Sequence, residues 1–222
     1  SERAGFVAHE MRNLLNTAIV AFDVLKTGNV GVGGSTGGVL QRSLIGARTL
    51  TSRSLGEVRL MQGVQNREQF VASGFIQELA PAAVLEGNAR GIGLRVMPGD
   101  DGVFVEGDRQ VLTAVVMNLL QNAFKFTKPG TTVVLRARAS LDRVLLEVED
   151  ECGGLPGGSV DDLFRPFEQR GADRSGLGLG LAFSRQAVEA NNGRIYVHNL
   201  PAKGCVFTID LPRVPTPGLA TV

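Results

Sequence analysis

The first cluster in this chain whose residue types could do chemistry is Ala8-His9-Glu10-Met11-Arg12-Asn13. A neutral imidazole exposed on a rigid helix can attack an electrophile through one nitrogen while a carboxylate orients the other. Glu10 is the candidate orienting carboxylate, and Asn13, one helical turn after His9, could position a water molecule or a phosphoryl oxygen. A lone histidine is more often an ordinary surface residue, so the catalytic interpretation depends on the motifs that accompany it.

A second cluster places two amides and an amine on one helical stripe. Asn118, Asn122 and Lys125 recur at i, i+4 and i+7, whereas Val115 and Leu119 can face a core. Amide oxygens are hard ligands suited to Mg²⁺, and a lysine ammonium is a good counter-ion for phosphate. A solvated polar face is the simpler alternative, but the stripe is also what a metal–triphosphate would require.

Two further clusters combine glycines with a carboxylate or with a helix start. Asp150 ends an apolar strand pattern and precedes Gly153-Gly154, so its carboxylate could accept a hydrogen bond from an exocyclic amine. The segment 175–183 has Gly176, Gly178 and Gly180 at alternate positions before an expected helix. Free backbone N–H groups at a helix start bind phosphate oxygens. Each motif alone is weak, and for the first, taken alone, an ordinary turn is the simpler explanation.

The elements that must position the first cluster are helical. An apolar series at alternating spacings of four and three residues predicts a long first helix, and three more apolar residues widen its stripe enough for a four-helix bundle. Residues 27–38 contain six glycines and predict a hairpin loop, after which a second helix is expected from Val39 to about Val64. One helical hairpin buries too little surface, so dimerisation is expected. The series is Val7, Met11, Leu14, Ala18, Ala21 and Leu25, and the widening residues are Leu15, Ile19 and Phe22.

After residue 66 the pattern changes to alternating strands and helices. Asp108 is a good N-cap for a helix that ends near Phe126. The other expected helices are 74–89, interrupted early by Pro81, and 178–190. We therefore expect helices on one face of a mixed or antiparallel sheet. The expected strands are 69–72, 93–97, 103–106, 132–139, 143–149, 194–198 and 204–211.

Composition narrows the function classes. A net charge of +1 gives no general attraction to nucleic acid or to a membrane surface, and no apolar run approaches the ~20 residues of a membrane span. The chain has only two histidines, which excludes a zinc site built from several imidazoles. Its two cysteines, Cys152 and Cys205, fit neither a metal spacing nor a disulfide framework, which suits a reducing cytoplasm. The chain does not begin with Met, so we expect a fragment whose upstream part could include a membrane anchor.

Taken in order, these motifs make the chain similar to the transmitter core of bacterial two-component sensor histidine kinases over about residues 1–212. His9-Glu10 with Asn13 resembles the phosphoacceptor box, and the Asn118–Lys125 segment resembles the asparagine box. The remaining matches are Asp150–Gly154 to the first glycine box, Phe164-Arg-Pro-Phe167 to the phenylalanine box, and Gly176, Gly178 and Gly180 to the second glycine box.

The resemblance implies a function for each motif. His9 would take the γ-phosphoryl group of ATP with Glu10 as its partner, and Asn13 would assist dephosphorylation of a response regulator. Asn122 would ligate Mg²⁺, Asn118 and Lys125 would act at the phosphates, and Asp150 would bind the adenine amine. Residues 155–175 would form a lid clamped by Phe164 and Phe167. The nucleotide-binding set is Asn118, Asn122, Lys125, Phe126, Asp150, Gly154, Phe167, Gly176, Gly178 and Gly180.

The resemblance also implies the domain plan and leaves two rival functions open. Residues 1–66 would be a dimerising phosphotransfer hairpin, residues 67–212 an α/β two-layer ATP-binding sandwich of the type shared with gyrase and the heat-shock chaperone, and residues 213–222 a disordered tail. Leu14 stands where the family usually has a helix-bending proline, and Cys152 stands where it has a glycine. The rivals are an ATPase of the same fold that forms no phosphohistidine and a degenerate, non-catalytic scaffold.

Overall fold

The computed structural model describes the backbone of residues 2–28, 31, 34–40, 43–44, 46–47, 51, 66–155, 160–165 and 180–215, and the side chains of the same residues except 2–10 and 160. The chain divides into two compact units, Ser1–Arg59 and Leu60–Val222, which we describe separately. None of the helices within the described ranges is long and apolar enough to cross a membrane.

The first unit is built on helix α1, Glu2–Lys26. The expected seam is confirmed for its described members, because Ala18 and Ala21 are buried and Met11, Leu14 and Leu25 are half-buried. The helix runs through Leu14 without a break, and a Cβ atom at Gly46 would lie 3.1 Å from Leu14 Cδ2. The residues expected to widen the stripe are instead exposed to solvent; they are Leu15, Ile19 and Phe22.

The glycine-rich hairpin is shorter than the sequence predicted. Residues 35–40 are helical, so the expected start of the second helix at Val39 was four residues too late. The backbone N–H of Gly38 donates to the carbonyl of Gly34 at 3.1 Å. A glycine costs a helix only ~1 kcal/mol relative to alanine, so it weakens a first turn without forbidding it. Residues 43, 44, 46, 47 and 51 are also helical.

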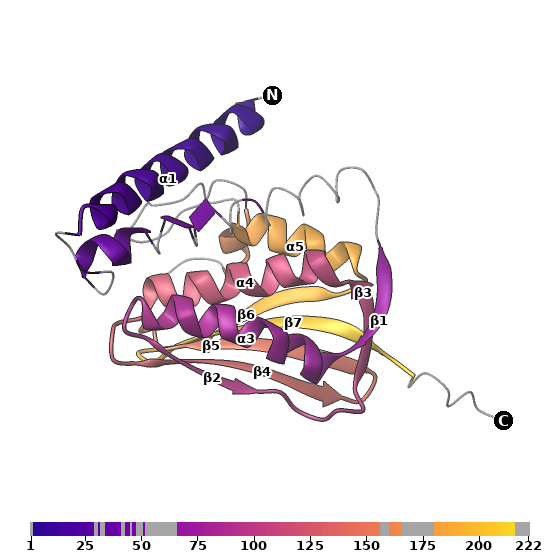
Figure 1. Ribbon diagram of the computed structural model, residues 1–222. Helices are drawn as coiled ribbons and strands as arrows, with labels where there is room; N and C mark the ends of the chain where they lie inside the picture. The colour runs from indigo at the N-terminus through magenta and orange to yellow at the C-terminus, as the bar shows by residue number, and fades with distance from the viewer. Residues whose placement is uncertain are drawn as a thin grey trace. The chain divides into compact units, whose positions relative to one another are not determined.

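The second unit is built on a seven-stranded mixed sheet with the order β1-β3-β7-β5-β4-β2, and β6 pairs with β7 (Figure 1). Only β2 and β4 are parallel neighbours among the described strands, and the other pairs are antiparallel. The long strand β7 pairs with β6 along its first part and with β3 at its end. The strands are β1 Arg67–Val71, β2 Gly93–Met97, β3 Phe104–Asp108, β4 Thr132–Ser140, β5 Arg143–Asp150, β6 Arg194–Leu200 and β7 Gly204–Val214.

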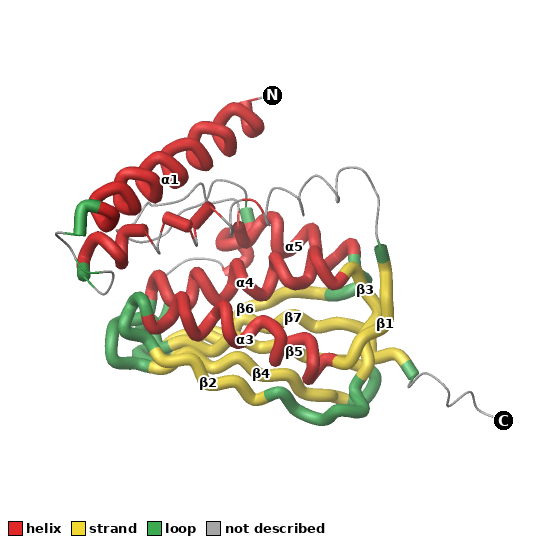
Figure 2. The backbone as a smooth tube through the Cα atoms, viewed as in Figure 1, coloured by secondary structure: helices red, strands yellow, loops and turns green. Residues whose placement is uncertain are grey.

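Helices α3 (Ala72–Asn88), α4 (Arg109–Phe126) and α5 (Gly180–Ala190) cover one face of this sheet (Figure 2). This confirms the predicted two-layer arrangement with a mixed sheet. Alternate strand residues face the helices, so that Leu135, Val148 and Phe207 lie in one cross-strand row of the core. The intervening residues carry ion pairs on the other face, such as Arg138 with Glu147.

Two boundaries in the second unit differ from the prediction. Helix α3 is continuous through Pro81, whereas an early interruption was expected. Its buried residues, Phe75 and Ile76 among them, hold the helix on the core, and this packing outweighs the ~3 kcal/mol that an interior proline costs. Strand β7 continues to Val214, which pairs with Phe104, so the first residues of the expected disordered tail are part of the sheet.

Candidate functional site

Helix α4 begins and ends where the sequence predicted and presents the amide stripe on one side. The Asp108 carboxylate accepts hydrogen bonds from the backbone N–H groups of Gln110 and Val111, both at 3.1 Å, and so caps the helix. Among the stripe residues, Asn118, Asn122 and Lys125 are half-buried, and Lys125 Nζ lies 5.1 Å from the centre of the exposed Phe126 ring. The apolar residues expected to face the sheet are fully buried; they are Val111, Val115, Leu119 and Ala123.

The end of the second glycine motif meets this stripe directly. Gly180 is the first residue of α5, and a Cβ atom there would overlap the amide oxygen of Asn118. The same amide donates from Nδ2 to Ser184 Oγ at 3.0 Å. A glycine is therefore required for α5 to approach α4 this closely, and the contact fixes the orientation of Asn118. Gly176 and Gly178 lie outside the described residues.

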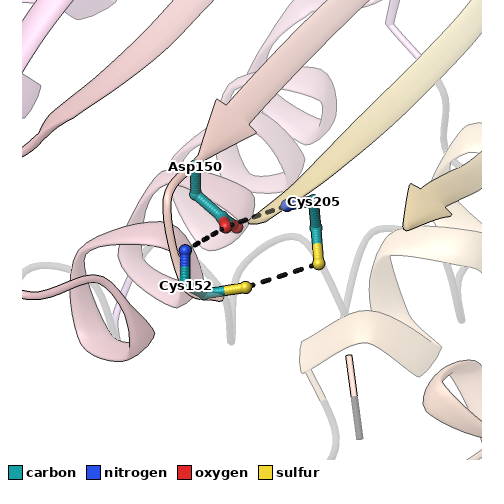
Figure 3. A group of neighbouring side chains, drawn as sticks. All are labelled: Asp150, Cys152 and Cys205. Carbon is teal, nitrogen blue, oxygen red and sulfur yellow. Dashed lines mark hydrogen bonds between the residues drawn. The ribbon is translucent and has the colours of Figure 1, made fainter. Parts of the chain in front are cut away.

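Asp150 ends β5 with its side chain buried. One carboxylate oxygen accepts hydrogen bonds from the backbone N–H groups of Cys152 at 2.9 Å and Cys205 at 3.1 Å (Figure 3). Burial raises the pKa of Asp150 above its usual range, although these hydrogen bonds act in the opposite direction. The start of β7 approaches just as closely, because a Cβ atom at Gly204 would overlap the Asp150 carbonyl oxygen.

The turn after Asp150 uses glycine where the backbone demands it. Gly153 and Gly154 have φ angles of 91° and 98°, a conformation that side chains rarely adopt. Cys152 is not among the described residues with positive φ, so its replacement of the family glycine causes no backbone strain. Asn199 Oδ1 accepts from the backbone N–H of Leu155 at 2.8 Å and holds the end of the turn.

Part of the expected lid is anchored to α5. The short 3-10 helix η1, Val160–Phe164, ends with Phe164 only 4% exposed. The guanidinium carbon of Arg185 lies 4.4 Å from the centre of the Phe164 ring, and Arg185 also pairs with Asp161 at 3.1 Å. Phe164 is thus part of the buried core and contacts α5 through Arg185. Phe167, assigned to the same clamp, lies outside the described residues.

The segment that resembles a phosphoacceptor box lies in the first unit, on α1. His9 and Glu10 are within the helix, but their side chains are outside what the structure describes. Asn13 is exposed, and its carbonyl accepts a hydrogen bond from Thr17 Oγ1 at 2.9 Å.

Sequence reasoning missed two residues that hold the site together. Asn191 directly follows the helix expected over 178–190 and was given no functional role, yet it is buried, accepts from the Asp108 N–H at 2.7 Å and donates to the Ala187 carbonyl at 2.8 Å. It thereby ties the start of α4 to the end of α5. Cys152 and Cys205 were expected to fit neither a metal spacing nor a disulfide framework, but strand pairing brings their sulfur atoms to 3.4 Å. The only sequence signal for Asn191 was its place in Asn191-Asn192-Gly193.

Comparison with known proteins identifies the class of this fold and site. Residues 107–215 match the family described as histidine kinase-, DNA gyrase B- and HSP90-like ATPases. Solved structures share the fold: a histidine kinase AdeS from Acinetobacter baumannii has a TM-score of 0.61 at 20% identity, covering 92% of this chain and 97% of that one. The catalytic domain of histidine kinase ThkA has a TM-score of 0.60 at 23% identity, covering 68% of this chain and 99% of that one.

Sequence relatives define the family more closely. Sensor protein DivL of Caulobacter vibrioides is 30% identical over 96% of this chain, and alginate biosynthesis sensor protein KinB of Pseudomonas aeruginosa is 36% identical over 57% of it. The chain spans 28% of the length of DivL and 21% of that of KinB. The chain belongs to the sensor histidine kinase family, and its second unit contains the ATPase domain.

Proposed function

We propose that this chain is the catalytic core of a sensor histidine kinase that transfers the γ-phosphoryl group of ATP to His9 and then to an aspartate of a response regulator. The observation that carries the proposal is the presence of three motifs in one unit, two of which are in contact. Gly180 packs on Asn118, Asn122 follows on the same helical face, and the buried Asp150 carboxylate is fixed at the end of β5.

Asp150 is the proposed adenine-recognising group. Its carboxylate is held by two backbone N–H groups, which leaves lone pairs to accept a hydrogen bond from an exocyclic amine. An acceptor of this kind favours adenine over guanine, whose corresponding position is a carbonyl oxygen. The related kinase ShkA, whose solved structure has a TM-score of 0.64 at 20% identity, was determined in complex with AMPPNP, an ATP analogue.

The donor set on α4 fits a magnesium–triphosphate group. Asn122 is half-buried and none of the hydrogen bonds found among the described residues engages its amide, so its oxygen is available as a hard ligand. Asn118 is oriented by Ser184, and Lys125 lies three residues after Asn122 on the same face. Mg²⁺ bound here would neutralise charge on the phosphoryl oxygens. Asn122 would hold the ion, and Asn118 and Lys125 would contact phosphate.

His9 is the proposed nucleophile in the first unit. One imidazole nitrogen would attack the γ-phosphorus in line, and the bond to the bridging oxygen would break to release ADP. Glu10 would hold the other ring nitrogen and stabilise the positive charge that forms on the ring. The phosphoryl group would then move to a carboxylate of the response regulator, which restores the free histidine.

The first unit supplies a reason to propose a homodimer. Leu15, Ile19 and Phe22 are between 44% and 57% exposed along α1, beside the buried seam. A second copy of the hairpin would cover this apolar face and complete a four-helix bundle.

Asn13 is proposed to assist the reverse reaction, dephosphorylation of the regulator, because it lies one turn after His9 and is exposed. Replacing Asn13 with Ala should leave autophosphorylation within about twofold and slow regulator dephosphorylation by about tenfold or more, since misplacing a reacting group by about 1 Å can cost roughly 10²-fold. Following the decay of a labelled regulator with each variant measures this. An unchanged decay rate would refute the role.

An assay of nucleotide turnover tests the proposed function against its two rivals. Incubation with ATP and Mg²⁺ should label the chain up to one phosphoryl group per protomer, with little sustained release of inorganic phosphate. Sustained hydrolysis without a labelled chain would support the ATPase alternative. Failure to bind a fluorescent ATP analogue would support the non-catalytic scaffold.

A further inference from the structure

Two thiols meet beside the carboxylate of the candidate nucleotide site. Cys152 lies two residues after the end of β5, and Cys205 is the second residue of β7. The β5–β7 ladder pairs Asp150 with Cys205, and the two sulfur atoms lie 3.4 Å apart across its end (Figure 3). Cys205 is fully buried and Cys152 is half-buried, so Cys152 is the more accessible residue of the pair.

The same two residues also hold the Asp150 side chain. Their backbone N–H groups are its hydrogen-bond donors, and the turn that carries Cys152 is tied to the β6–β7 connection by a hydrogen bond from Gly153 N–H to the Lys203 carbonyl at 3.1 Å. A disulfide requires a sulfur–sulfur distance near 2.05 Å, so its formation would need the two atoms to approach by roughly 1.4 Å. Because the backbone N–H groups of the same two cysteines donate to Asp150, this movement would also shift those hydrogen bonds.

We propose that Cys152 and Cys205 are a redox-active thiol pair, which hydrogen peroxide converts into an intramolecular disulfide, and that this bond weakens nucleotide binding at Asp150. The bond itself is independent of the proposed kinase function, whereas its effect on nucleotide binding rests on that function. Neither cysteine belongs to the group transfer described above, so the pair adds a second chemistry to the site.

The reaction balances in two steps. The Cys152 sulfur attacks one peroxide oxygen, the O–O bond breaks, and a sulfenic acid and one molecule of water result. The Cys205 sulfur then attacks the sulfenic sulfur and displaces a second molecule of water, which forms the disulfide. Two thiols lose two electrons and two protons, and the peroxide is reduced to water. Cys152 reacts first because it is the more accessible thiol.

Burial and the neighbouring carboxylate determine how fast the two thiols should react with peroxide. Burial raises the pKa of Cys152 and of Cys205, and the neighbouring Asp150 carboxylate raises both further. Because the thiolate is the nucleophile, the reaction should be slow at neutral pH and accelerate as the pH rises. The pair should therefore respond to sustained rather than brief oxidant exposure.

Mass spectrometry of the full-length chain tests whether the bond forms. The reduced protein is treated with excess hydrogen peroxide at mildly alkaline pH, denatured and alkylated. We expect a species that has lost two hydrogen atoms, contains a peptide linking Cys152 to Cys205, and returns to two alkylated thiols after dithiothreitol. Cys205→Ser is the matched control and should stop at an oxygen adduct on Cys152.

Two results would contradict the proposed formation of a disulfide between Cys152 and Cys205. Two alkylated thiols in the treated wild type would show that the pair is inert. The Asp150 carboxylate and both sulfur atoms also lie within 4.8 Å of one another, which is a spacing that a metal ion could use. Zinc that binds with unit stoichiometry and keeps both thiols reduced under peroxide would replace the redox pair with a metal site.

Titration with a fluorescent ATP analogue tests the consequence. Oxidised wild type should bind at least about fivefold more weakly than reduced wild type, the lower end of typical coupling between sites. Dithiothreitol should restore the affinity, and Cys205→Ser should show no such reversible loss. Equal affinity of the two forms would overturn the effect, whereas absence of binding by the reduced form would overturn the proposed function and leave the disulfide mapping intact.

Discussion

At the scale of single residues, Asp150 connects the fold most closely to the proposed chemistry. In Asp150→Asn, the amide oxygen can still accept from the Cys152 and Cys205 N–H groups, so the turn should be preserved. The variant loses the negative charge that would accept from an adenine amine. Since a hydrogen bond to a charged group contributes ~1.5–3 kcal/mol, affinity for an ATP analogue should fall by about tenfold or more. Fluorescence titration measures this, and an unchanged Kd would contradict the assignment.

The stability difference between Asp150→Asn and wild type should also depend on pH. The pKa of Asp150 is raised in the folded state by burial, so the folded chain binds a proton at a higher pH than the unfolded chain does. The charged form therefore costs stability at neutral pH, and this cost disappears as the pH falls through the raised pKa toward the unfolded value of ~3.9. The stability advantage of Asp150→Asn over wild type should shrink over that interval. Urea unfolding at a series of pH values measures it, and an advantage that grows on acidification would contradict the burial argument.

A substitution at Gly180 tests the close contact between the start of α5 and Asn118 on α4. In Gly180→Ala, the new methyl group overlaps the Asn118 amide oxygen, so either α5 must shift or the amide must turn away. We expect nucleotide affinity to fall about tenfold and stability to fall by ~1–3 kcal/mol, the usual cost of overpacking. Gly74→Ala is the matched control, because Gly74 is within α3 and a Cβ atom there meets nothing within 4 Å. That control should be neutral or stabilising by up to ~1 kcal/mol. Equal behaviour of the two variants by thermal melting and titration would contradict the close approach.

Some features of the candidate site could be predicted from residue types and spacing, and others could not. Asp108 as a cap and the Asn118–Lys125 stripe follow from local spacing, because cap chemistry and helical periodicity act over a few residues. The pairing of Cys152 with Cys205 does not, because it depends on which strands become neighbours across 53 residues of chain.

At the scale of elements, α1 carries a face that its own unit leaves uncovered. Ile19 is 57% exposed, and burying it in a dimer would contribute roughly 1.5–3 kcal/mol. Ile19→Glu should therefore raise the dimer dissociation constant by at least about tenfold, measured by light scattering across a dilution series. Thr17→Glu is the control, since residue 17 is exposed and lies nearly opposite residue 19 around the helix. A monomeric wild type, or equal dimerisation of both variants, would contradict the four-helix proposal.

Element boundaries show which signals were decisive. The bounds of α4 were predicted, with its cap at Asp108 and its end near Phe126, whereas the early start of the second helix and the continuity of α3 were missed. In both missed cases glycine or proline was given more weight than packing. Pro81 shows the reason: the buried face of α3 holds the helix in place on both sides of the proline.

At the scale of the whole molecule, the layer arrangement was predictable and the strand order was not. Apolar alternation indicates strands and their buried faces, but β7 lies between β3 and β5 and also pairs with β6, and no local pattern encodes these neighbours. The order of the chemical motifs indicated the family instead. The proposed function requires a phosphoacceptor helix and a nucleotide-binding fold, and the chain divides into two compact units, Ser1–Arg59 and Leu60–Val222.

Incubation with γ-labelled ATP and Mg²⁺, comparing wild type with His9→Ala, tests the central claim most directly. The labelled chains are divided and treated with acid or with alkali. A phosphohistidine predicts wild-type label that survives alkali and is lost in acid, together with no label on His9→Ala, which should still bind the ATP analogue as wild type does. Label that remains on His9→Ala, or its absence from a wild type that binds ATP, would contradict the assignment of His9 as the phosphoacceptor.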